Sequence, residues 1–212
     1  MIDTRRYATL LAKGEDRKIQ ILAAAQRLLT RYGWRSTSLA QIAREAGVSP
    51  AGLLHHFESK EQLLHAVLDA RDQDDDRHAD RTGVITDQLL RVAERFERSP
   101  DLVGTFSVLV SENIDPAAPL HDRLLARYRA AVDTVAGQIR RGQRAGVYRD
   151  DVDPAVKAVE IVAFLNGMET SWLLDRSIPL QGAFQDYVQS LRRELAPAAA
   201  ASDTASPSSH RT

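Results

Sequence analysis

Hydroxyl-bearing, small and basic residues gather between Ser36 and Leu64, where the chain reads STSLAQIAREAGVSPAGLLHHFESKEQLL. Hydroxyl groups at the start of a helix, together with its free backbone N–H groups, suit a phosphate, and a lysine adds a positive charge. Small residues let a backbone come close to the edges of bases. The chemistry that these residue types offer is therefore the binding of nucleic acid.

Short helices must position these groups, and the first of them is marked at both ends. Ser38 followed by Gln41 is the S-x-x-Q pattern of a capping box, which predicts a helix over residues 38–46. Gly47 predicts the end of that helix, because a turn that needs a positive φ costs least at glycine.

The next two helices are marked in the same way. Ser49 can cap a helix, and Pro50 suits its first position because the N–H that proline lacks would be unpaired there, so we expect a helix over residues 50–57. Ser59 and Gln62 repeat the capping pattern and predict that a further helix starts at once.

Two short helices joined by a tight turn form the helix-turn-helix that reads DNA. We expect the apolar side chains of Ile42, Leu53 and Phe57 to hold the two helices together at a steep angle. The second helix is then the probe that enters the major groove, with its small residues approaching the bases. The residues that we assign to DNA binding are Thr37, Ser38, Gln41, Ser49, Pro50, Ala51, Gly52, His55, His56 and Lys60.

Three of these residues are assigned to the DNA backbone. Thr37 and Ser38 stand where a helix start offers hydroxyl and N–H groups to a phosphate, and Lys60 suits a phosphate clamp. Adjacent residues on a helix point in different directions, so we interpret His55 and His56 as DNA-facing or partly packed rather than as ligands of one metal ion. Attraction that does not depend on base sequence is expected from Arg5, Arg6, Lys13, Arg17 and Lys18.

The charge of the chain is uneven. Residues 1–60 contain ten Lys or Arg against five Asp or Glu, and residues 61–212 contain eighteen against twenty-four. The net charges of +5 and −6 sum to the −1 of the whole chain. A basic N-terminal part on an acidic body is the distribution that contact with DNA at one end requires.

The composition excludes several classes of protein. Hydrophobic residues make up 43% of the 212 residues, which is enough for a core. The lack of cysteine excludes disulfides, thiolate chemistry and zinc sites built on cysteine. No apolar run approaches the ~18 residues of a membrane span, and the N-terminus has no long apolar segment typical of a secretory signal. We therefore expect a soluble cytoplasmic protein with no metal and no cofactor.

Apolar residues at helical spacing and the lack of strand patterns predict an all-α fold. We interpret the acidic run from Asp69 to Asp80, which includes His78, as a solvated helix end or linker. It lacks the glycine turn and terminal glutamate of a calcium loop. The longer helices are expected at about 16–32, 81–98, 101–113, 119–145, 154–175 and 180–195.

Residues 15–75 resemble the N-terminal domain of the TetR family of transcriptional regulators. The chain departs from the family pattern at Leu54, where the family most often has a tyrosine that contacts a phosphate, and His55 or His56 is the alternative group for that contact. The residues that carry the resemblance are Thr37, Ile42-Ala43, Ala46-Gly47-Val48-Ser49, His56-Phe57, Ser59-Lys60-Glu61 and Leu63-Leu64.

The resemblance implies a homodimer that binds a palindromic DNA operator and is released from it by a small-molecule effector. The last two long helices would form the interface, and the segment FLNGMETSWLLDRSIPL is similar to the penultimate helix of one branch of regulators. The domains implied are a flexible basic arm (1–14), a DNA-binding domain (15–75, with the helix-turn-helix at 38–57), a helical ligand-binding and dimerisation domain (76–195) and a disordered tail (196–212).

Residues in the C-terminal part are candidates for the wall of an effector pocket. The competing interpretation of each is ordinary core packing, and for Trp172 it is also a contact between subunits. The candidates are Phe106, Val110, Tyr128, Met168 and Trp172, with Asn166 or Glu169 as polar anchors.

Other functions remain as alternatives. A helical enzyme is disfavoured because the chain has no glycine-rich phosphate loop, no G-x-S-x-G elbow and no H-E-x-x-H pattern. A ligand-independent DNA-binding protein is disfavoured because the region after the DNA-binding domain is far larger than coating DNA requires. A transcriptional activator of the same fold is an alternative to a repressor.

Overall fold

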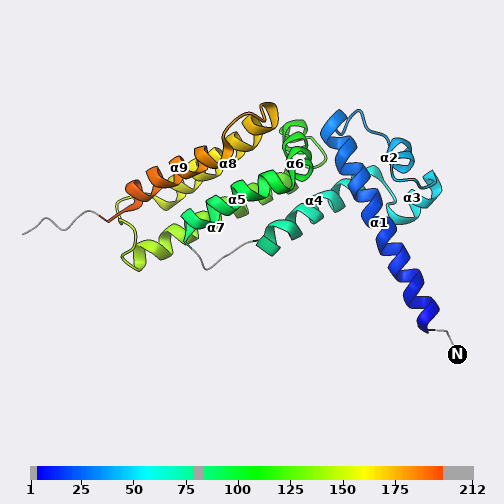
Figure 1. The fold of residues 1–212 in the computed structure, drawn as a ribbon, viewed down its shortest axis with the longest axis horizontal. Helices are drawn as coiled ribbons and strands as arrows, with labels where there is room; N and C mark the ends of the chain where they lie inside the picture. The colour runs from blue at the N-terminus through cyan, green and yellow to red at the C-terminus, as the bar shows by residue number, and fades with distance from the viewer. Residues whose placement is uncertain (1–3, 79–83, 198–212) are drawn as a thin grey trace, which may run out of the picture.

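The computed structural model describes residues 4–78 and 84–197 of the chain. Within these ranges helices are the only regular elements, and the predicted all-α fold is confirmed (Figure 1). The helices form two groups, each around a core of its own.

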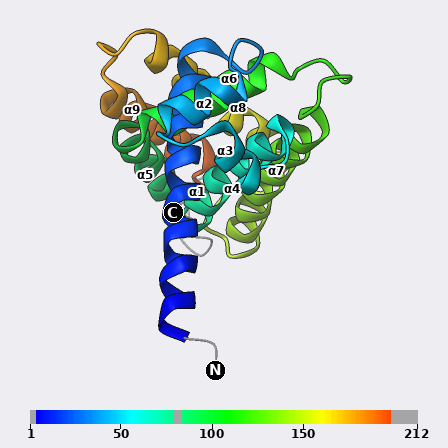
Figure 2. The ribbon, with the colours of Figure 1, turned by 90° about the vertical axis from the view of Figure 1, so that its right-hand side faces the viewer.

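The N-terminal group lies at one end of the molecule, where α2 and α3 are side by side at the outer surface (Figures 1 and 2). Its core includes Ile21, Ile42, Leu53, Phe57 and Leu64, all of which are almost fully buried. The helices of this group are α1 (Thr4–Tyr32), α2 (Leu39–Glu45), α3 (Pro50–His56) and α4 (Lys60–His78).

The turn between α2 and α3 has the predicted construction. Ser38 Oγ accepts the Gln41 N–H at 3.2 Å, and Gln41 Oε1 accepts the Ser38 N–H at 2.7 Å. Gly47 has a φ of 66°. Ser49 Oγ accepts the N–H of Gly52 at 3.0 Å, which caps α3. These contacts satisfy N–H groups that a helix start leaves unpaired, so the predicted helix-turn-helix is confirmed.

The start of the chain differs from the prediction. The helix expected from about Asp16 begins at Thr4, so residues 4–14 continue α1 instead of forming a flexible arm. The physical reason is that this segment contains leucine, alanine, arginine and lysine, which favour helix, and contains no proline to break it. Most of the tail predicted at 196–212 lies outside the described residues.

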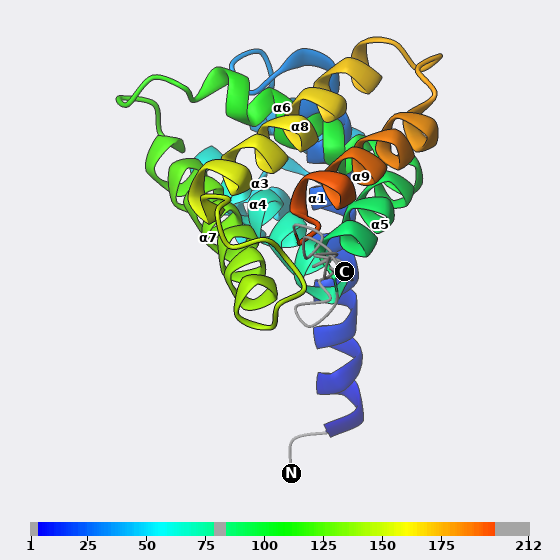
Figure 3. The ribbon, with the colours of Figure 1, turned by 90° about the vertical axis from the view of Figure 1, so that its left-hand side faces the viewer.

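The C-terminal group is a bundle whose helices pack around a second core (Figure 3). That core includes Phe96, Ile139, Ile161, Phe184 and Leu191. The predicted helices after residue 81 are confirmed to within a few residues at each end, as α5 (Ile85–Arg98), α6 (Pro100–Glu112), α7 (His121–Arg144), α8 (Pro154–Leu174) and α9 (Leu180–Leu195).

The two groups meet where α6 crosses α1. A Cβ atom added to Gly104 would lie 2.7 Å from the Thr30 side chain, so the close approach of the two helices requires glycine there. The hydroxyl groups of Thr30 and Thr105 lie 2.7 Å apart across the same contact. Leu109 and Leu124, from the C-terminal group, are buried in the N-terminal core. Side chains from both sides of the boundary predicted at residue 75 therefore pack in one core.

Candidate functional site

The outer surface of α3 presents the predicted DNA-facing residues. Pro50, Ala51 and His55 are exposed, and Leu54, at the position where the family most often has tyrosine, is 47% exposed. Gly52 is half-buried, and its backbone N–H donates to the hydroxyl of Ser49. The N-terminal end of α3 is thus small in outline and free of bulky side chains.

The two histidines lie at the other end of α3. The rings of His55 and His56 meet edge to face, with centroids 5.5 Å apart. A hollow of about 320 Å³ lies between α1 and α3, and Arg17 lines it together with the two histidines. It is lined by Gly14, Arg17, Val48, Ser49, Gly52, His55 and His56. Arg17 of α1 therefore adds a positive charge close to the outer surface of α3.

Thr37 and Ser38 were both assigned to phosphate at the start of α2, but they differ in exposure. Ser38 and Gln41 are exposed. Thr37 is only 2% exposed, and its hydroxyl donates to the Gly33 carbonyl oxygen at 2.7 Å. The assignment of the Thr37 hydroxyl to phosphate is therefore corrected, because this group closes the turn between α1 and α2 and faces inward.

Lys60, at the start of α4, contacts the protein itself. Its ammonium group donates to the Trp34 carbonyl oxygen at 2.6 Å and lies 3.7 Å from the centroid of the Trp34 ring. Burial lowers the pKa of Lys60, while the nearby carboxylates of Glu61 and Glu112 act in the opposite direction. The phosphate contact expected of Lys60 thus competes with a contact inside the protein.

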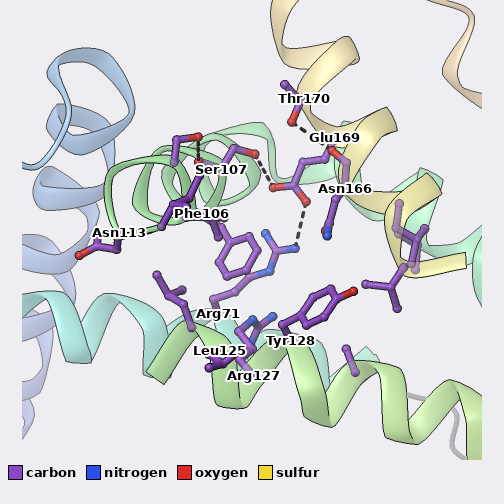
Figure 4. Close-up of a pocket in the computed structure, with 18 of the residues that line it drawn as sticks. Arg71, Phe106, Ser107, Asn113, Leu125, Arg127, Tyr128, Asn166, Glu169 and Thr170 are labelled. Atoms are coloured by element: carbon purple, nitrogen blue, oxygen red, sulfur yellow. Dashed lines mark hydrogen bonds and ion pairs between the residues drawn. The ribbon is translucent and has the colours of Figure 1, made fainter. Parts of the chain in front are cut away.

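A cavity of about 450 Å³ lies between the two groups of helices, with walls from α4, α5, α6, α7 and α8 (Figure 4). Among the candidate pocket residues, five line it: Phe106, Val110, Tyr128, Asn166 and Glu169. Much of the remaining wall is apolar and includes Val92, Phe96, Leu124, Leu125, Val162 and Leu165.

Trp172 and Met168 do not line the cavity, and the pocket assignment of Trp172 is corrected. The Trp172 side chain packs in the second core and is 8% exposed, and the Arg176 guanidinium lies 3.7 Å from its ring centroid. Glu169 lines the cavity, whereas Trp172, about one turn later on α8, packs in the second core, so the cavity does not extend as far as Trp172.

One end of the cavity is strongly polar. Glu169 accepts a hydrogen bond of 2.7 Å from the Ser107 hydroxyl, and its other oxygen lies 3.9 Å from the Arg71 guanidinium. The side chains of Arg71 and Glu169 are each 6% exposed. Charges buried to this degree require partners, and Figure 4 shows these three side chains converging beside Phe106.

A second guanidinium belongs to the same polar end. Arg127 lies 4.8 Å from the Phe106 ring centroid and Arg71 lies 5.2 Å from it. Burial, and then the positive charge of Arg71, lower the pKa of Arg127 to about 10. Arg127 also forms an ion pair with Asp72 of α4.

Eight polar residues of the cavity wall were not among the candidates, and three of them, Arg71, Ser107 and Arg127, lie around Glu169 and Phe106. Arg71 was recognisable, because it follows Val67 by four residues and so continues the buried stripe of α4. Ser107 and Arg127 stand in stretches with no comparable signal.

Part of the acidic run on α4 is not simply solvated. Asp69 and Asp72 form ion pairs with Arg123 of α7 at 2.6 and 3.2 Å. These pairs attach α4 to α7 beside the cavity. The side chain of His78 lies outside the described residues.

Comparison with known proteins shows which regulators this chain resembles. The sequence model of the bacterial regulatory proteins, tetR family, matches residues 21–67. The regulator TtgR of Pseudomonas putida is 26% identical over 192 residues, which cover 83% of this chain and 90% of TtgR. The chain is therefore similar to TetR-family regulators along most of its length, and its residues 21–67 match the family's own sequence model. It is a DNA-binding transcriptional regulator.

Solved structures of TetR-family proteins share the fold. NalD, the secondary repressor of the MexAB-OprM multidrug efflux pump in Pseudomonas aeruginosa, superposes with a TM-score of 0.69 at 21% identity, over 86% of this chain and 97% of NalD. SmeT in complex with triclosan superposes with a TM-score of 0.70 at 18% identity, over 83% of this chain and 91% of SmeT. Across the ranges that the structure describes, no helix is both long and apolar enough to cross a membrane.

Proposed function

We propose that this protein is a repressor of the TetR family that binds a palindromic operator as a homodimer and leaves it when a small molecule fills the cavity. The observation that carries the proposal is the position of the 450 Å³ cavity. One of its walls is α4, the helix that directly follows the helix-turn-helix. A ligand there touches the element that orients the probe.

The proposed DNA surface is the exposed side of α2 and α3. Pro50, Ala51 and Gly52 approach base edges, since their small size lets the backbone come close. Ser38 and Gln41, with Ser49, lie at helix starts where N–H and hydroxyl groups suit phosphates. The histidine pair and Arg17 supplement these contacts at the far end of α3.

The proposed subunit interface is formed by α8 and α9 of two copies. Val156 and Val159 of α8 are 56% and 44% exposed and lie three residues apart, on one side of the helix. Exposed apolar residues that share a helix face are typical of a contact between subunits. A two-fold dimer places two probes about one turn of DNA apart, which explains why we expect a palindrome.

Release requires that the ligand bind the DNA-incompetent form more tightly than the competent form. SmeT bound to triclosan supports the view that a fold of this kind holds a small molecule. We propose that the ligand is bound and released without chemical change. Mass spectrometry of ligand recovered after incubation tests this, because a changed mass would favour an enzyme.

The experiment that tests the function is selection of bound DNA from a random pool by the purified protein. Enrichment of an inverted repeat supports the dimeric regulator, and enrichment of a single unrepeated half-site argues against the dimer. If no DNA sequence is enriched in the selection, the result would favour a protein that coats DNA without sequence preference. Fusion of the selected site to a reporter then separates repressor from activator, because loss of the protein raises expression only if it represses.

A further inference from the structure

The hollow between α1 and α3 has an uneven chemical lining. The two helices run beside each other at the end of the molecule that carries the helix-turn-helix (Figure 2). Arg17 lines the hollow from α1, and His55 and His56 line it from α3. The hollow therefore holds one permanent positive charge and two imidazole groups that can each gain one.

Negative charge is missing from the described lining of this hollow. Glu15 and Asp16 of α1 and Glu58, which follows α3, are the acidic residues closest to it along the chain. All three are exposed, and none of them lines the hollow. Apart from Arg17, the charged or titratable groups of the described lining are the two histidines themselves.

The two imidazole rings lie close to each other as well as to the hollow. Their centroids are 5.5 Å apart, edge to face. When protonated, rings at this distance repel each other and the guanidinium that shares the hollow. An anion in the hollow offsets this repulsion, and protonated imidazoles donate charge-assisted hydrogen bonds to phosphate oxygens. Binding of an anion is therefore coupled to uptake of protons.

The position of the hollow indicates which anion binds there. Its lining shares Ser49, Gly52 and His55 with the proposed DNA surface, and duplex DNA presents about one negative charge for every ~1.7 Å of its axis. We infer that the hollow is a proton-linked site for a phosphate of the DNA backbone, which binds between Arg17 and the histidines. The inference rests on the proposed DNA surface.

The predicted consequence is that DNA affinity depends on pH. Histidine is the side chain that ordinarily changes its charge between about pH 5 and 8. Because the phosphate favours the protonated rings, affinity is expected to rise as pH falls. The added affinity is complete below the pH at which the rings titrate in the free protein. It is lost as pH rises through the pH at which they titrate on DNA. Protons would then act on DNA binding through α3, separately from a molecule in the cavity.

Fluorescence anisotropy of the full chain with its selected operator tests this, at fixed ionic strength and in buffers without phosphate. We expect affinity to be about tenfold or more higher at about pH 5.5 than at about pH 8. The double variant His55→Gln with His56→Gln is expected to reduce this ratio to about twofold or less. His121→Gln, which changes a histidine of α7, is the matched control and should keep the full ratio. A flat profile of the unmodified protein overturns the inference, as does a folded double variant that keeps the ratio.

A duplex without the operator separates this inference from the proposed repressor function. A backbone contact carries no sequence information, so the same pH ratio is expected at lower overall affinity. This measurement tests the hollow even if selection yields no operator. A pH ratio confined to the operator would mean that the histidines read bases, which contradicts the phosphate assignment.

Arg17→Gln locates the phosphate in the hollow. The change is expected to weaken binding to both duplexes and to lower the slope of log affinity against log salt by roughly one. Arg129→Gln, at an exposed position of α7, is the matched control and should alter neither. An unchanged slope in a folded Arg17→Gln protein counts against the site.

Nuclear magnetic resonance of the histidine ring protons distinguishes DNA from free phosphate as the source of the anion. The rings of His55 and His56 are expected to titrate at higher pH on DNA than in the free protein, because the bound phosphate stabilises their charged form. If inorganic phosphate alone changes their titration and DNA does not, the hollow takes free phosphate and the inference is wrong.

Discussion

Leu54 lacks the hydroxyl group that a phosphate contact at its position would need. It stands where the resemblance leads one to expect a phosphate-binding tyrosine, and its exposed apolar side chain offers no hydrogen bond. His55, which is exposed next to it, and Arg17, which lies beside the histidine pair, are the polar groups nearest to that function.

Ala51 is the residue that tests α3 as the probe. Ala51→Glu places a carboxylate against phosphates and base acceptors, and we expect operator affinity to fall by about 100-fold or more, because like charges in contact cost several kcal/mol. The measurement is a DNA-binding titration by fluorescence anisotropy. Ala126→Glu, on the exposed side of α7, is the matched control and should bind normally. If a folded Ala51→Glu protein retained operator binding, α3 would not be the helix that contacts the bases.

The related change at Gly52 is less informative. A Cβ atom there would meet the Ser49 hydroxyl at 3.1 Å, and that hydroxyl caps α3. A double variant with Ala51→Glu and Gly52→Glu is thus expected to disturb the start of α3 as well as to add negative charge. Its loss of DNA binding has two causes, and only comparison with the Ala51→Glu single variant separates them.

Lys60 has two candidate partners, and one variant separates them. Lys60→Ala removes the contacts with Trp34, and we expect the free energy of unfolding to fall by about 1 to 2 kcal/mol. If Lys60 also reaches a phosphate, the slope of log affinity against log salt falls by roughly one, with equal weakening for all DNA sequences. Urea unfolding and salt titrations measure the two effects.

Lys60→Arg, which keeps the charge, serves as the control for the salt slope. An unchanged slope in Lys60→Ala would assign Lys60 wholly to Trp34. A change in base preference would mean instead that Lys60 reads bases.

Among the elements, α6 connects the cavity to the helix-turn-helix. Phe106, Ser107 and Val110 of α6 line the cavity. At its C-terminal end, Glu112 Oε2 accepts the Trp34 N–H at 2.6 Å, in the turn that leads into α2. A displacement of α6 by a ligand would therefore reach the turn before the helix-turn-helix directly, in addition to any path through α4.

Glu112→Ala tests that connection. We expect a loss of about 1.5 to 3 kcal/mol in the free energy of unfolding, because a charge-assisted hydrogen bond to a part-buried N–H is removed. We also expect the factor by which an effector weakens operator binding to shrink about threefold or more. Thermal unfolding and DNA titrations with and without effector measure these. Glu94→Ala, which breaks an exposed pair with Arg98 on α5, is the control and should change neither.

At the scale of the whole molecule, α2 and α3 lie at one end of an elongated shape, and α8 and α9 lie in the bundle toward the other end (Figure 1). A dimer formed through the bundle leaves both probes free to face one DNA duplex. Its geometry, and hence the operator spacing, depends on the contact between α8 and α9 of the two copies.

The paired change Val156→Asp and Val159→Asp tests the interface. Charges placed on this side of α8 are expected to shift the protein to monomer in sedimentation experiments, because unpaired charges are costly to bury. Affinity for the full palindrome should fall about 100-fold, while affinity for a single half-site stays the same, since only the linkage of two probes is lost. Val147→Asp, at a 55% exposed position before α8, is the control. A variant that stays dimeric would place the interface elsewhere.

The sequence by itself determined the local structures of the DNA-binding part. Capping boxes, Gly47 and the Ser49-Pro50 pair act within a few residues of the chain, so their effect on α2 and α3 does not depend on the rest of the fold. Among the later helices, α5 has a clear apolar period along the chain, whereas α8 is apolar on most of its sides.

Tertiary structure alone decided which side chains meet. Thr37 and Ser38 are neighbours with similar hydroxyl groups, yet packing turned Thr37 into the fold and left Ser38 outside. Arg71, Ser107, Arg127 and Glu169 come from four helices, and only the crossing of those helices brings them to one end of a cavity. Local hydrogen bonds set helix ends, but buried charge clusters depend on contacts between distant segments, which the sequence does not display.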